Sequence, residues 1–309
     1  MKRDLHESVL LNEAVEALAI TPAGWYIDGT YGRGGHTRAI LAQLGTQGRV
    51  LAIDKDQTAV ESAKQEWRDE PRLDVVQGSF ARLREFASQQ GMLGHAAGIL
   101  LDLGVSSPQL EDPTRGFSFQ LDGPLDMRMD QTTGKSAALF LAETDEQTLI
   151  DVLKNYGEER FARRIARAII AERRETPITR TQQLVEIVTR AVPKREPHKN
   201  PATRTFQALR ICVNEELSDL AQVLAQAVDV LKPGGRLVVI SFHSLEDRIV
   251  KEFMRGQKLS EVLPREIPIT EDKELKPIRA ISKAIKPSEA EIAHNPRSRS
   301  AIMRIAEKL

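Results

Sequence analysis

Four continuous apolar segments alternate with helical sequence in the first hundred residues, and this pattern constrains the fold more than any other feature. The segments are residues 24–28, 49–54, 74–78 and 98–102, and two of them are followed by regular helical spacing of apolar residues. Strands without polar alternation are buried on both faces, as in a parallel sheet that helices cover on each side. We therefore predict an α/β domain that binds its ligands outside the carboxyl ends of the strands.

The alternation stops after residue 102 and returns near the end of the chain. Residues 104–135 have neither a strand nor a helix period, which indicates a long loop. Three helical patterns follow, and two have capping-box sequences, Thr144 with Gln147 and Thr179 with Gln182. A third stretch, from Asn200 to Leu231, keeps a helical period and predicts one helix of roughly thirty residues. Residues 232–235 read as a turn, 236–241 as a fifth parallel strand, and 301–306 as the last strand.

This order predicts two domains. Residues 1–108 and 213–309 form a Rossmann-like α/β sheet, and residues 109–212 form an inserted helical domain. A length of 309 residues is sufficient for two cores.

Composition narrows the class further. Hydrophobic residues make up 41%, charged residues 28%, and the mean hydropathy is −0.34, as in an ordinary globular chain. No apolar run approaches the roughly 18 residues of a membrane span, and the charged N-terminus does not resemble a signal peptide, so we expect a cytoplasmic protein with no membrane partner. A single cysteine excludes an internal disulfide, and the spacing of the six histidines predicts no metal site.

The zero net charge conceals a basic region. Residues 154–210 hold 14 Lys and Arg against 6 Asp and Glu, which leaves 30 against 38 in the rest of the chain. A basic segment on a neutral protein suggests a polyanionic partner, although a solvated helix face would have the same composition. The candidates for phosphate contacts are Arg163, Arg164, Arg167, Arg173, Arg174, Arg204 and Arg210.

A glycine-rich loop follows the first strand. It begins at Asp28 and contains Gly32, Gly34 and Gly35 before His36. Glycines let the backbone approach a ligand closely and let a helix begin beneath it. Thr37 occupies the third glycine position of a dinucleotide fingerprint, which disfavours a nicotinamide cofactor. The loop suits S-adenosyl-L-methionine, which has a cation and an amino-acid group but no pyrophosphate.

Further candidate ligand contacts stand at the ends of the next strands. Asp54 ends the second strand, where a carboxylate can accept both hydroxyls of a ribose. Phe80, after the third strand, could stack on adenine. Alternatively, Asp54 caps the following helix and Phe80 packs in the core.

Asp102 ends the fourth strand, where this fold presents its chemistry. Methylation of an exocyclic base amine needs an acceptor for the amine protons, and Asp102 could supply one, although a turn cap is the alternative. Attack on a ring carbon would need an accessible thiolate. Cys212 lies within an apolar helical stretch and fits a small buried residue better.

Six long motifs in order closely resemble the bacterial ribosomal RNA small subunit methyltransferase H family. They are residues 28–36, 100–109, 115–130, 156–165, 200–214 and 241–250. The resemblance implies a class I methyltransferase sheet with a helical insertion, S-adenosyl-L-methionine as donor, and methylation of a cytosine N4 amine in the decoding region of 16S rRNA in the small ribosomal subunit. It assigns the donor contacts to Gly34, Gly35, His36, Asp54, Phe80, Asp102 and Gln109.

We expect the base pocket to combine Ser241 and His243, at the end of the fifth strand, with Phe117 or Phe119 from the long loop. The candidate catalytic residues are thus Asp102, Ser241 and His243. Three alternatives stay open: a methyltransferase acting on DNA or a free nucleotide, a non-enzymatic ribosome assembly factor, and a nicotinamide dehydrogenase. Naked rRNA or the assembled subunit as substrate, and a homodimer or a monomer, are not distinguished.

Overall fold

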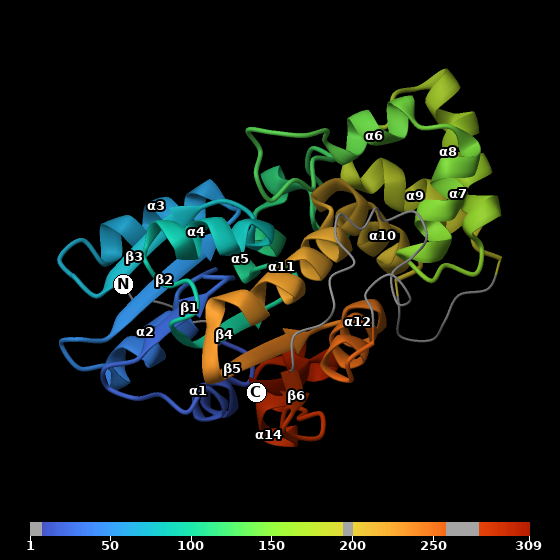
Figure 1. The fold of residues 1–309 in the computed structure, drawn as a ribbon. Helices are drawn as coiled ribbons and strands as arrows, with labels where there is room; N and C mark the ends of the chain where they lie inside the picture. Colours follow the sequence, from blue (N-terminus) through green and yellow to red (C-terminus); the bar gives the residue numbers. More distant parts are fainter. Residues whose placement is uncertain (1–7, 194–199, 258–277) are drawn as a thin grey trace. The chain divides into compact units, whose positions relative to one another are not determined.

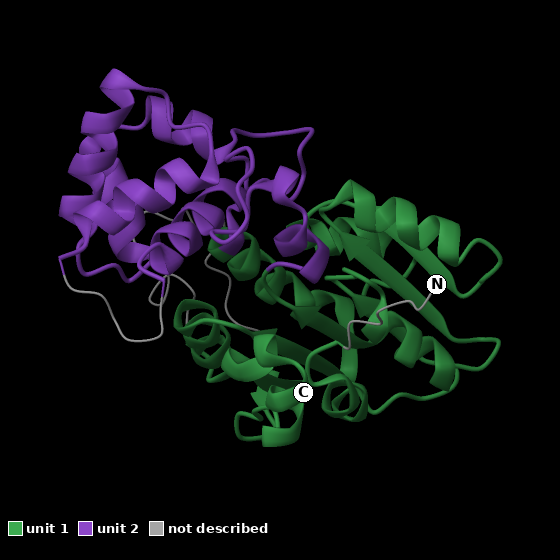
Figure 2. Cartoon of the chain, turned by 180° about the vertical axis from the view of Figure 1, so that it is seen from behind, with its two compact units in different colours: residues 1–104, 217–309 green, residues 105–216 purple. Residues whose placement is uncertain are grey.

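The computed structural model describes residues 8–193, 200–257 and 278–309, and the chain divides into two compact units. Unit 1 comprises residues 1–104 and 217–309, and unit 2 comprises residues 105–216 (Figure 2). The insertion expected from the sequence, residues 109–212, falls within unit 2. In the part of the chain that is described, no helix is both long and apolar enough to cross a bilayer.

Unit 1 is built on a seven-stranded sheet (Figure 1). Its order is β3-β2-β1-β4-β5-β7-β6, and β7 runs antiparallel to both β5 and β6. The four strands predicted near the N-terminus and the fifth parallel strand are confirmed, whereas the three-residue β6 was not predicted. The strands are β1 (Trp25–Asp28), β2 (Arg49–Asp54), β3 (Leu73–Gln77), β4 (Ala96–Asp102), β5 (Leu231–Ser241), β6 (Ile278–Ala280) and β7 (Ile302–Lys308).

Helices cover both faces of this sheet. Right-handed crossovers place α2 and α3 on one face, and α4 and α11 on the other. Val50 and Leu100 pack with α1 and α2 on the first face, and the alternate residues Leu51 and Ile99 are fully buried on the second. The helices are α1 (Leu11–Ala17), α2 (Gly35–Gln43), α3 (Gln57–Glu66), α4 (Leu83–Gln89), α11 (Glu216–Val230), α12 (Ser244–Met254) and α14 (Glu289–His294), with short 3₁₀ turns η1 (Phe80–Arg82) and η3 (Pro296–Ser300).

The strand order reverses between β1 and β4. Chain connections leave these two strands in opposite directions, so a crevice opens at their carboxyl ends, and ligands of open α/β sheets bind there. Asp28 and Asp102 are the last residues of β1 and β4. The topology therefore brings two of the predicted site residues to the switch point.

Unit 2 is helical and has its own core. Leu149, Ile165, Leu184 and Leu209, from four different helices, are completely buried in one cluster. The amphipathic spacing of these helices explains the cluster, because each presents one apolar stripe. The elements are α5 (Ser107–Glu111), η2 (Pro113–Arg115), α6 (Ala137–Glu143), α7 (Glu146–Asn155), α8 (Ala162–Glu175), α9 (Thr181–Ala191) and α10 (Thr203–Asn214).

The long loop before α6 belongs to this core. Phe117 is 5% exposed and Met127 is fully buried, and Leu125 N–H donates to Thr179 O. Phe119 is partly buried and packs edge-on against Phe206 at 5.9 Å. Phe117 is therefore part of the core of unit 2, and of the two phenylalanines expected for the base pocket, Phe119 is the more exposed.

Two helix caps and one strand boundary differ from the prediction. The cap of α7 is Asp145, which accepts Thr148 N–H, and the cap of α9 is Arg180, whose N–H donates to Gln183. Both begin later than the sequence pattern indicated. β5 begins at Leu231 and includes residues 232–235, which were expected to form a separate turn; the register with β4 shifts there.

The predicted thirty-residue helix is wrong. The chain forms α10 and α11 instead, and Glu215 between them has a left-handed backbone with φ of 56°. Asn214 is buried, its Nδ2 donates to Met127 O and Arg210 O, and its Oδ1 accepts Met129 N–H. The apolar period continues through this point because both helices bury a stripe, so periodicity alone did not reveal the break.

Candidate active site

Asp28 organises the glycine-rich loop from the end of β1. Its buried carboxylate accepts Thr30 N–H at 3.1 Å and the Thr37 hydroxyl at 2.7 Å. Burial raises the pKa of Asp28, and the neighbouring His36 and these hydrogen bonds oppose that rise. Asp28 therefore stabilises the conformation of the glycine-rich loop, and both of its carboxylate oxygens are already hydrogen-bonded within the loop and the first turn of α2.

Two glycines of the loop adopt a left-handed backbone. Gly34, with φ of 71°, precedes α2, and a Cβ there would lie 2.5 Å from the Tyr31 hydroxyl. Gly32, with φ of 54°, differs, because its Cβ would meet nothing closer than 3.9 Å. The backbone at Gly32 thus borders open space, which a bound group can fill. Gly35 begins α2 directly behind the loop.

Asp54 fastens the end of β2 to this loop. Its Oδ2 accepts Gly32 N–H at 2.7 Å and its Oδ1 accepts Asp56 N–H at 2.8 Å. Burial raises the pKa of Asp54 to about 6. Each carboxylate oxygen can accept a second hydrogen bond, so Asp54 retains capacity for ligand hydroxyls. Phe80, at the start of η1, lies close to the beginning of the glycine-rich loop. Its Cβ is 3.6 Å from the position that a Cβ on Gly29 would take.

Asp102 stands at the end of β4, beside the loop. Its N–H donates to the Thr30 hydroxyl at 2.6 Å, and its Oδ2 lies 3.8 Å from His36 Nδ1. Burial raises the pKa of Asp102 well above its ordinary value, and the charges of Asp28 and Glu246 raise it further. Burial lowers the pKa of His36. The pair is therefore a neutral imidazole beside a carboxyl group of enhanced basicity.

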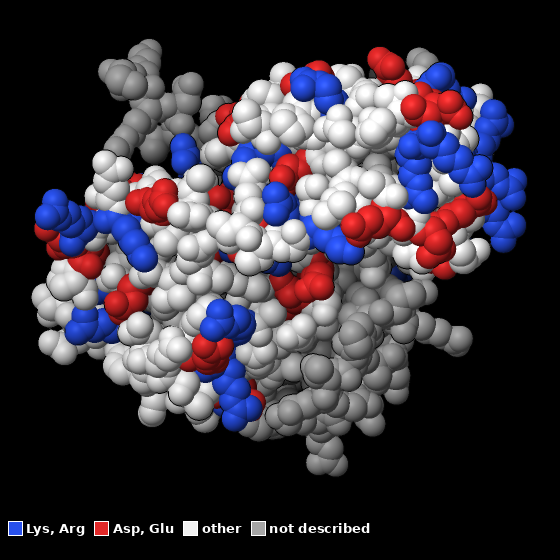
Figure 3. All heavy atoms as spheres, turned by 90° about the horizontal axis from the view of Figure 1, so that it is seen from above, with Lys and Arg blue, Asp and Glu red and all other residues white. Residues whose placement is uncertain are grey.

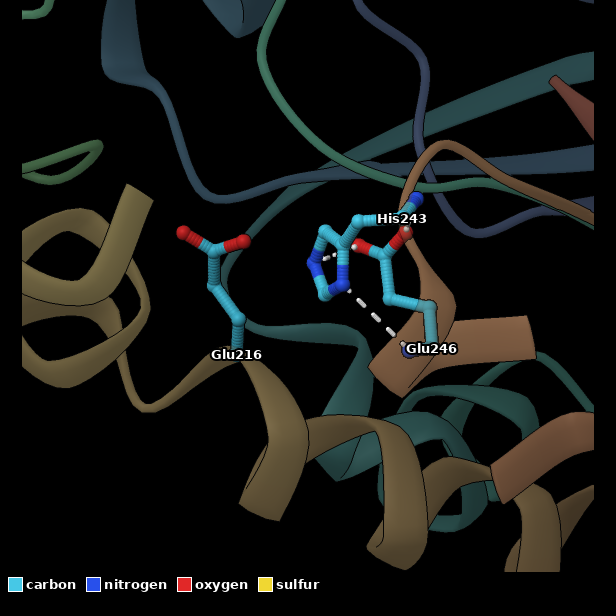
Figure 4. A group of neighbouring side chains, drawn as sticks. All are labelled: Glu216, His243 and Glu246. Carbon is cyan, nitrogen blue, oxygen red and sulfur yellow. Dashed lines mark hydrogen bonds and ion pairs between the residues drawn. The ribbon is translucent and has the colours of Figure 1, made fainter. Parts of the chain in front are cut away.

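Ser241 and His243 follow at the end of β5. Ser241 is 1% exposed, and His243 caps α12. Glu246 holds this turn: its Oε2 accepts Phe242 N–H at 2.8 Å and His243 N–H at 3.3 Å, and its Oε1 is 3.1 Å from His243 Nε2 (Figure 4). Glu246 is almost fully buried. The imidazole is therefore fixed in orientation by a carboxylate three residues further along the chain.

The predicted site concentrates unpaired polar atoms. Among the described residues, three buried side-chain atoms of predicted site residues lack a hydrogen-bond partner. Leaving such an atom unpaired costs free energy, so a group of them indicates a missing polar ligand. The three atoms are His36 Nε2, Asp102 Oδ1 and Ser241 Oγ; His243 Nε2 is not among them, because Glu246 Oε1 lies 3.1 Å away.

Unit 2 contains Gln109, a predicted donor contact, and Cys212, which the sequence argument rejects as a nucleophile. Gln109 is buried and its Oε1 accepts Ser106 N–H at 2.9 Å, so it completes a capping box at the start of α5. Cys212 packs partly against the core of unit 2, and burial raises the pKa of its thiol to about 11. A protonated thiol at neutral pH is a poor nucleophile, in agreement with the sequence argument.

Thr30 and Glu246 were not predicted as site residues. Thr30 lies inside the glycine-rich loop, and its hydroxyl accepts the N–H of Asp102 in β4. No local sequence pattern predicts this contact, because the two residues are far apart in the chain. Glu246 had a usable signal, because it stands three residues after the helix cap His243 in a capping-box arrangement.

Some arginine side chains of the basic region form hydrogen bonds within unit 2, and others are exposed. The Arg173 guanidinium donates to Leu141 O and Thr144 O, and Arg210 forms a double hydrogen bond with Glu216, so contacts within unit 2 already hold these two guanidinium groups. Four arginines share the exposed face of α8, opposite its buried stripe. They are Arg163, Arg164, Arg167 and Arg174. On the face drawn in Figure 3, basic and acidic side chains are intermixed.

The strand order, the antiparallel β7 and the glycine-rich loop at the switch point define a class I, Rossmann-like methyltransferase fold. A family model described as the MraW methylase family matches residues 3–309, and the chain therefore belongs to that family of methyltransferases.

Curated relatives are highly similar. Two proteins named ribosomal RNA small subunit methyltransferase H, from the Paris and Philadelphia 1 strains of Legionella pneumophila, are each 56% identical over 304 residues, covering 98% of this chain and 99% of theirs. Among solved structures, an rRNA methylase from Streptococcus thermophilus is 14% identical, covering 100% of this chain and 98% of its own, with a TM-score of 0.40. That structural likeness is too low to add to the argument.

Proposed function

We propose that this protein uses S-adenosyl-L-methionine to methylate the N4 amine of a cytosine in the decoding region of 16S rRNA. The names of the 56% identical relatives support the substrate class. The single structural observation that supports the site is the group of three unpaired buried polar atoms, on Asp102 and Ser241 at the carboxyl ends of β4 and β5 and on His36 in the first turn of α2.

The donor site comprises the open backbone at Gly32, the Asp54 carboxylate and the Phe80 ring. Gly32 leaves room for a bound group, Asp54 has unused acceptor positions for ribose hydroxyls, and Phe80 offers an aromatic face for adenine. Gly34 and Gly35 permit the tight turn into α2, whose N-terminus favours a carboxylate group. These features fit S-adenosyl-L-methionine. Gln109 is in unit 2, where its side chain caps α5, and its contact with the methyl donor stays a prediction.

Asp102 is the proposed acceptor of the amine proton. When bound, S-adenosyl-L-methionine supplies an electrophilic methyl group. The nitrogen–methyl bond forms as the sulfur–methyl bond breaks, and one N4 proton must leave. Asp102 Oδ1 is buried and unpaired, and the raised pKa makes its carboxylate a stronger base. His36 Nδ1 lies 3.8 Å from Oδ2, beyond hydrogen-bond distance.

Ser241 and His243 are proposed to hold the cytosine. Ser241 Oγ can pair with a base edge, and the His243 ring, whose two nitrogens contact Glu246, can stack on the base. Both stand at the end of β5, which pairs directly with β4, so they flank Asp102. Unit 2 is proposed to recognise the RNA backbone through the exposed arginines of α8, in the small ribosomal subunit of the cytoplasm.

The test is transfer of tritium from labelled S-adenosyl-L-methionine to small subunits and to naked rRNA, followed by nucleoside mass analysis. We expect label in N4-methylcytidine. In Asp102→Asn the rate should fall by roughly 100-fold or more, while S-adenosylhomocysteine still binds. Because wild-type Asp102 must be ionised, its rate should rise with pH through the raised pKa. Label in another nucleoside would overturn the specificity, and donor binding without any label would favour an assembly factor.

A further inference from the structure

Helix α11 forms hydrogen bonds and an ion pair with the segment that contains Phe80. Its residues Asp219, Gln226 and Asp229 share one face, being seven and three positions apart. Gln226 Nε2 donates to Ala81 O at 2.6 Å, and Gln226 Oε1 accepts Arg84 N–H at 2.8 Å. Asp229 pairs with Arg84 at 3.4 Å. Gln226 therefore holds the backbone at Ala81 and Arg84, whereas Asp229 contacts only the Arg84 side chain.

Asp219 makes the innermost of these contacts. Its Oδ2 accepts the Ser79 hydroxyl at 2.6 Å and the Lys55 ammonium at 3.1 Å. Asp219 is only 7% exposed, so this ion pair is shielded from water far more than Arg84–Asp229, where the arginine side chain is 52% exposed. Shielded, charge-assisted hydrogen bonds are stronger and more directional than exposed ones.

The two partners of Asp219 each adjoin a donor-site residue. Lys55 directly follows Asp54, and Ser79 directly precedes Phe80. The two strand ends are also tied to each other, because Gly78 N–H donates to Asp54 O at 2.8 Å. One carboxylate oxygen thus binds the side chain next to the proposed ribose acceptor and the side chain next to the proposed adenine-stacking ring.

We propose that Asp219 is a positioning residue for the adenosine half of the donor site, acting through Lys55 and Ser79 on Asp54 and Phe80. This inference rests on the proposed function. Contacts that fix two binding groups before the ligand arrives remove part of the ordering cost from the binding step. Asp219 does not touch the reacting methyl group, so its loss should weaken donor binding and leave the chemical step unchanged.

Asp219→Asn is the informative variant. Asparagine keeps the size and can still accept the Ser79 hydroxyl, whereas it loses the charge that holds Lys55; that lysine is 28% exposed and can turn to water. Calorimetric titration with S-adenosylhomocysteine should show Kd raised about tenfold. The matched control is Asp229→Asn on the same helix, whose ion pair with the half-exposed Arg84 side chain involves neither neighbour of Asp54 and Phe80; its Kd should stay within about twofold.

A double-mutant cycle with Phe80→Ala separates positioning from general loosening. If Asp219 acts partly through Phe80, the two substitutions together should weaken binding by clearly less than the product of their separate effects. In steady-state assays Asp219→Asn should raise the KM for the donor, with kcat at saturating donor within about twofold of wild type.

The outcomes are distinguishable. Failure of the wild-type protein to bind S-adenosylhomocysteine would overturn the proposed function itself. Wild-type binding with an unchanged Kd in Asp219→Asn would overturn only the positioning role, and so would a lower melting temperature without a change in Kd. Strictly multiplicative effects in the cycle would also overturn action through Phe80.

Discussion

At the scale of single residues, three acids at the ends of adjacent strands share one physical state. Asp28, Asp54 and Asp102 all have their pKa raised by burial. None has a cation as a close hydrogen-bonded partner; instead they accept backbone N–H groups or leave an oxygen unpaired. Uncompensated carboxylates destabilise the folded state at neutral pH, which is a common cost of a binding site.

Asp54 permits a test of this cost. Its pKa rises from 3.8 to about 6, so the folded state holds the proton more tightly than the unfolded state between those pH values. The contribution to stability is therefore present below pH 4 and is lost as pH rises through 6, by at most about 3 kcal/mol. Asp54→Asn lacks this titration. Its free energy of unfolding relative to wild type should increase between pH 4 and pH 7.

Urea denaturation across that range measures the difference, and an Asp69→Asn variant serves as control, because Asp69 is exposed. A relative stability that does not vary with pH would contradict the burial argument. The same variant should bind S-adenosylhomocysteine more weakly, since an asparagine cannot accept two ribose hydroxyls as well as a carboxylate.

At the scale of elements, the break between α10 and α11 depends on one buried amide and one strained residue. Asn214→Ala would leave Met127 O and Met129 N–H without that partner inside unit 2. We expect a loss of roughly 2–3 kcal/mol in the free energy of unfolding. Glu215→Gly should have the opposite sign, a gain of up to about 1 kcal/mol, because glycine adopts a φ of 56° without steric cost.

Chemical denaturation of both variants measures these effects. In an uninterrupted helix, glycine at this position would instead cost about 1 kcal/mol. Destabilisation by Glu215→Gly would therefore contradict the break.

At the scale of the whole molecule, the exposed arginines of α8 carry the prediction about RNA. Replacing Arg163, Arg164, Arg167 and Arg174 by Gln should weaken rRNA binding and flatten its dependence on salt by roughly 0.7–0.9 in log–log slope per lost phosphate contact. The Kd for S-adenosylhomocysteine should not change. The measurement is filter binding between 50 and 200 mM salt, about the range over which such contacts respond.

A matched variant removes four exposed cations of unit 1. These are Lys64, Arg68, Lys232 and Arg279. If it reduced the salt slope as much as the α8 variant, net charge rather than the α8 face would explain binding. An unchanged slope in the α8 variant would favour the solvated-face interpretation of the basic region.

The amino-acid sequence by itself determined every strand of the sheet except β6, the glycine-rich loop and the acids that end β1, β2 and β4. These features depend on local patterns: an apolar run forms a buried strand, and the residue at its end must lie at the edge of the sheet. The family resemblance rested on such contiguous motifs, and the family model matches nearly the whole chain.

The tertiary structure alone decided which polar groups meet. Asp219 reaches Ser79 across 140 positions, Asn214 breaks a continuous apolar period, and Arg173 is used inside unit 2 although its neighbour Arg174 is exposed. A hydrogen bond forms wherever a donor and an acceptor are brought within about 3 Å, and local periodicity contains no signal for such distant encounters. The same limit hid Thr30 and Asp219, whose roles arise only when separate strands and helices are packed together.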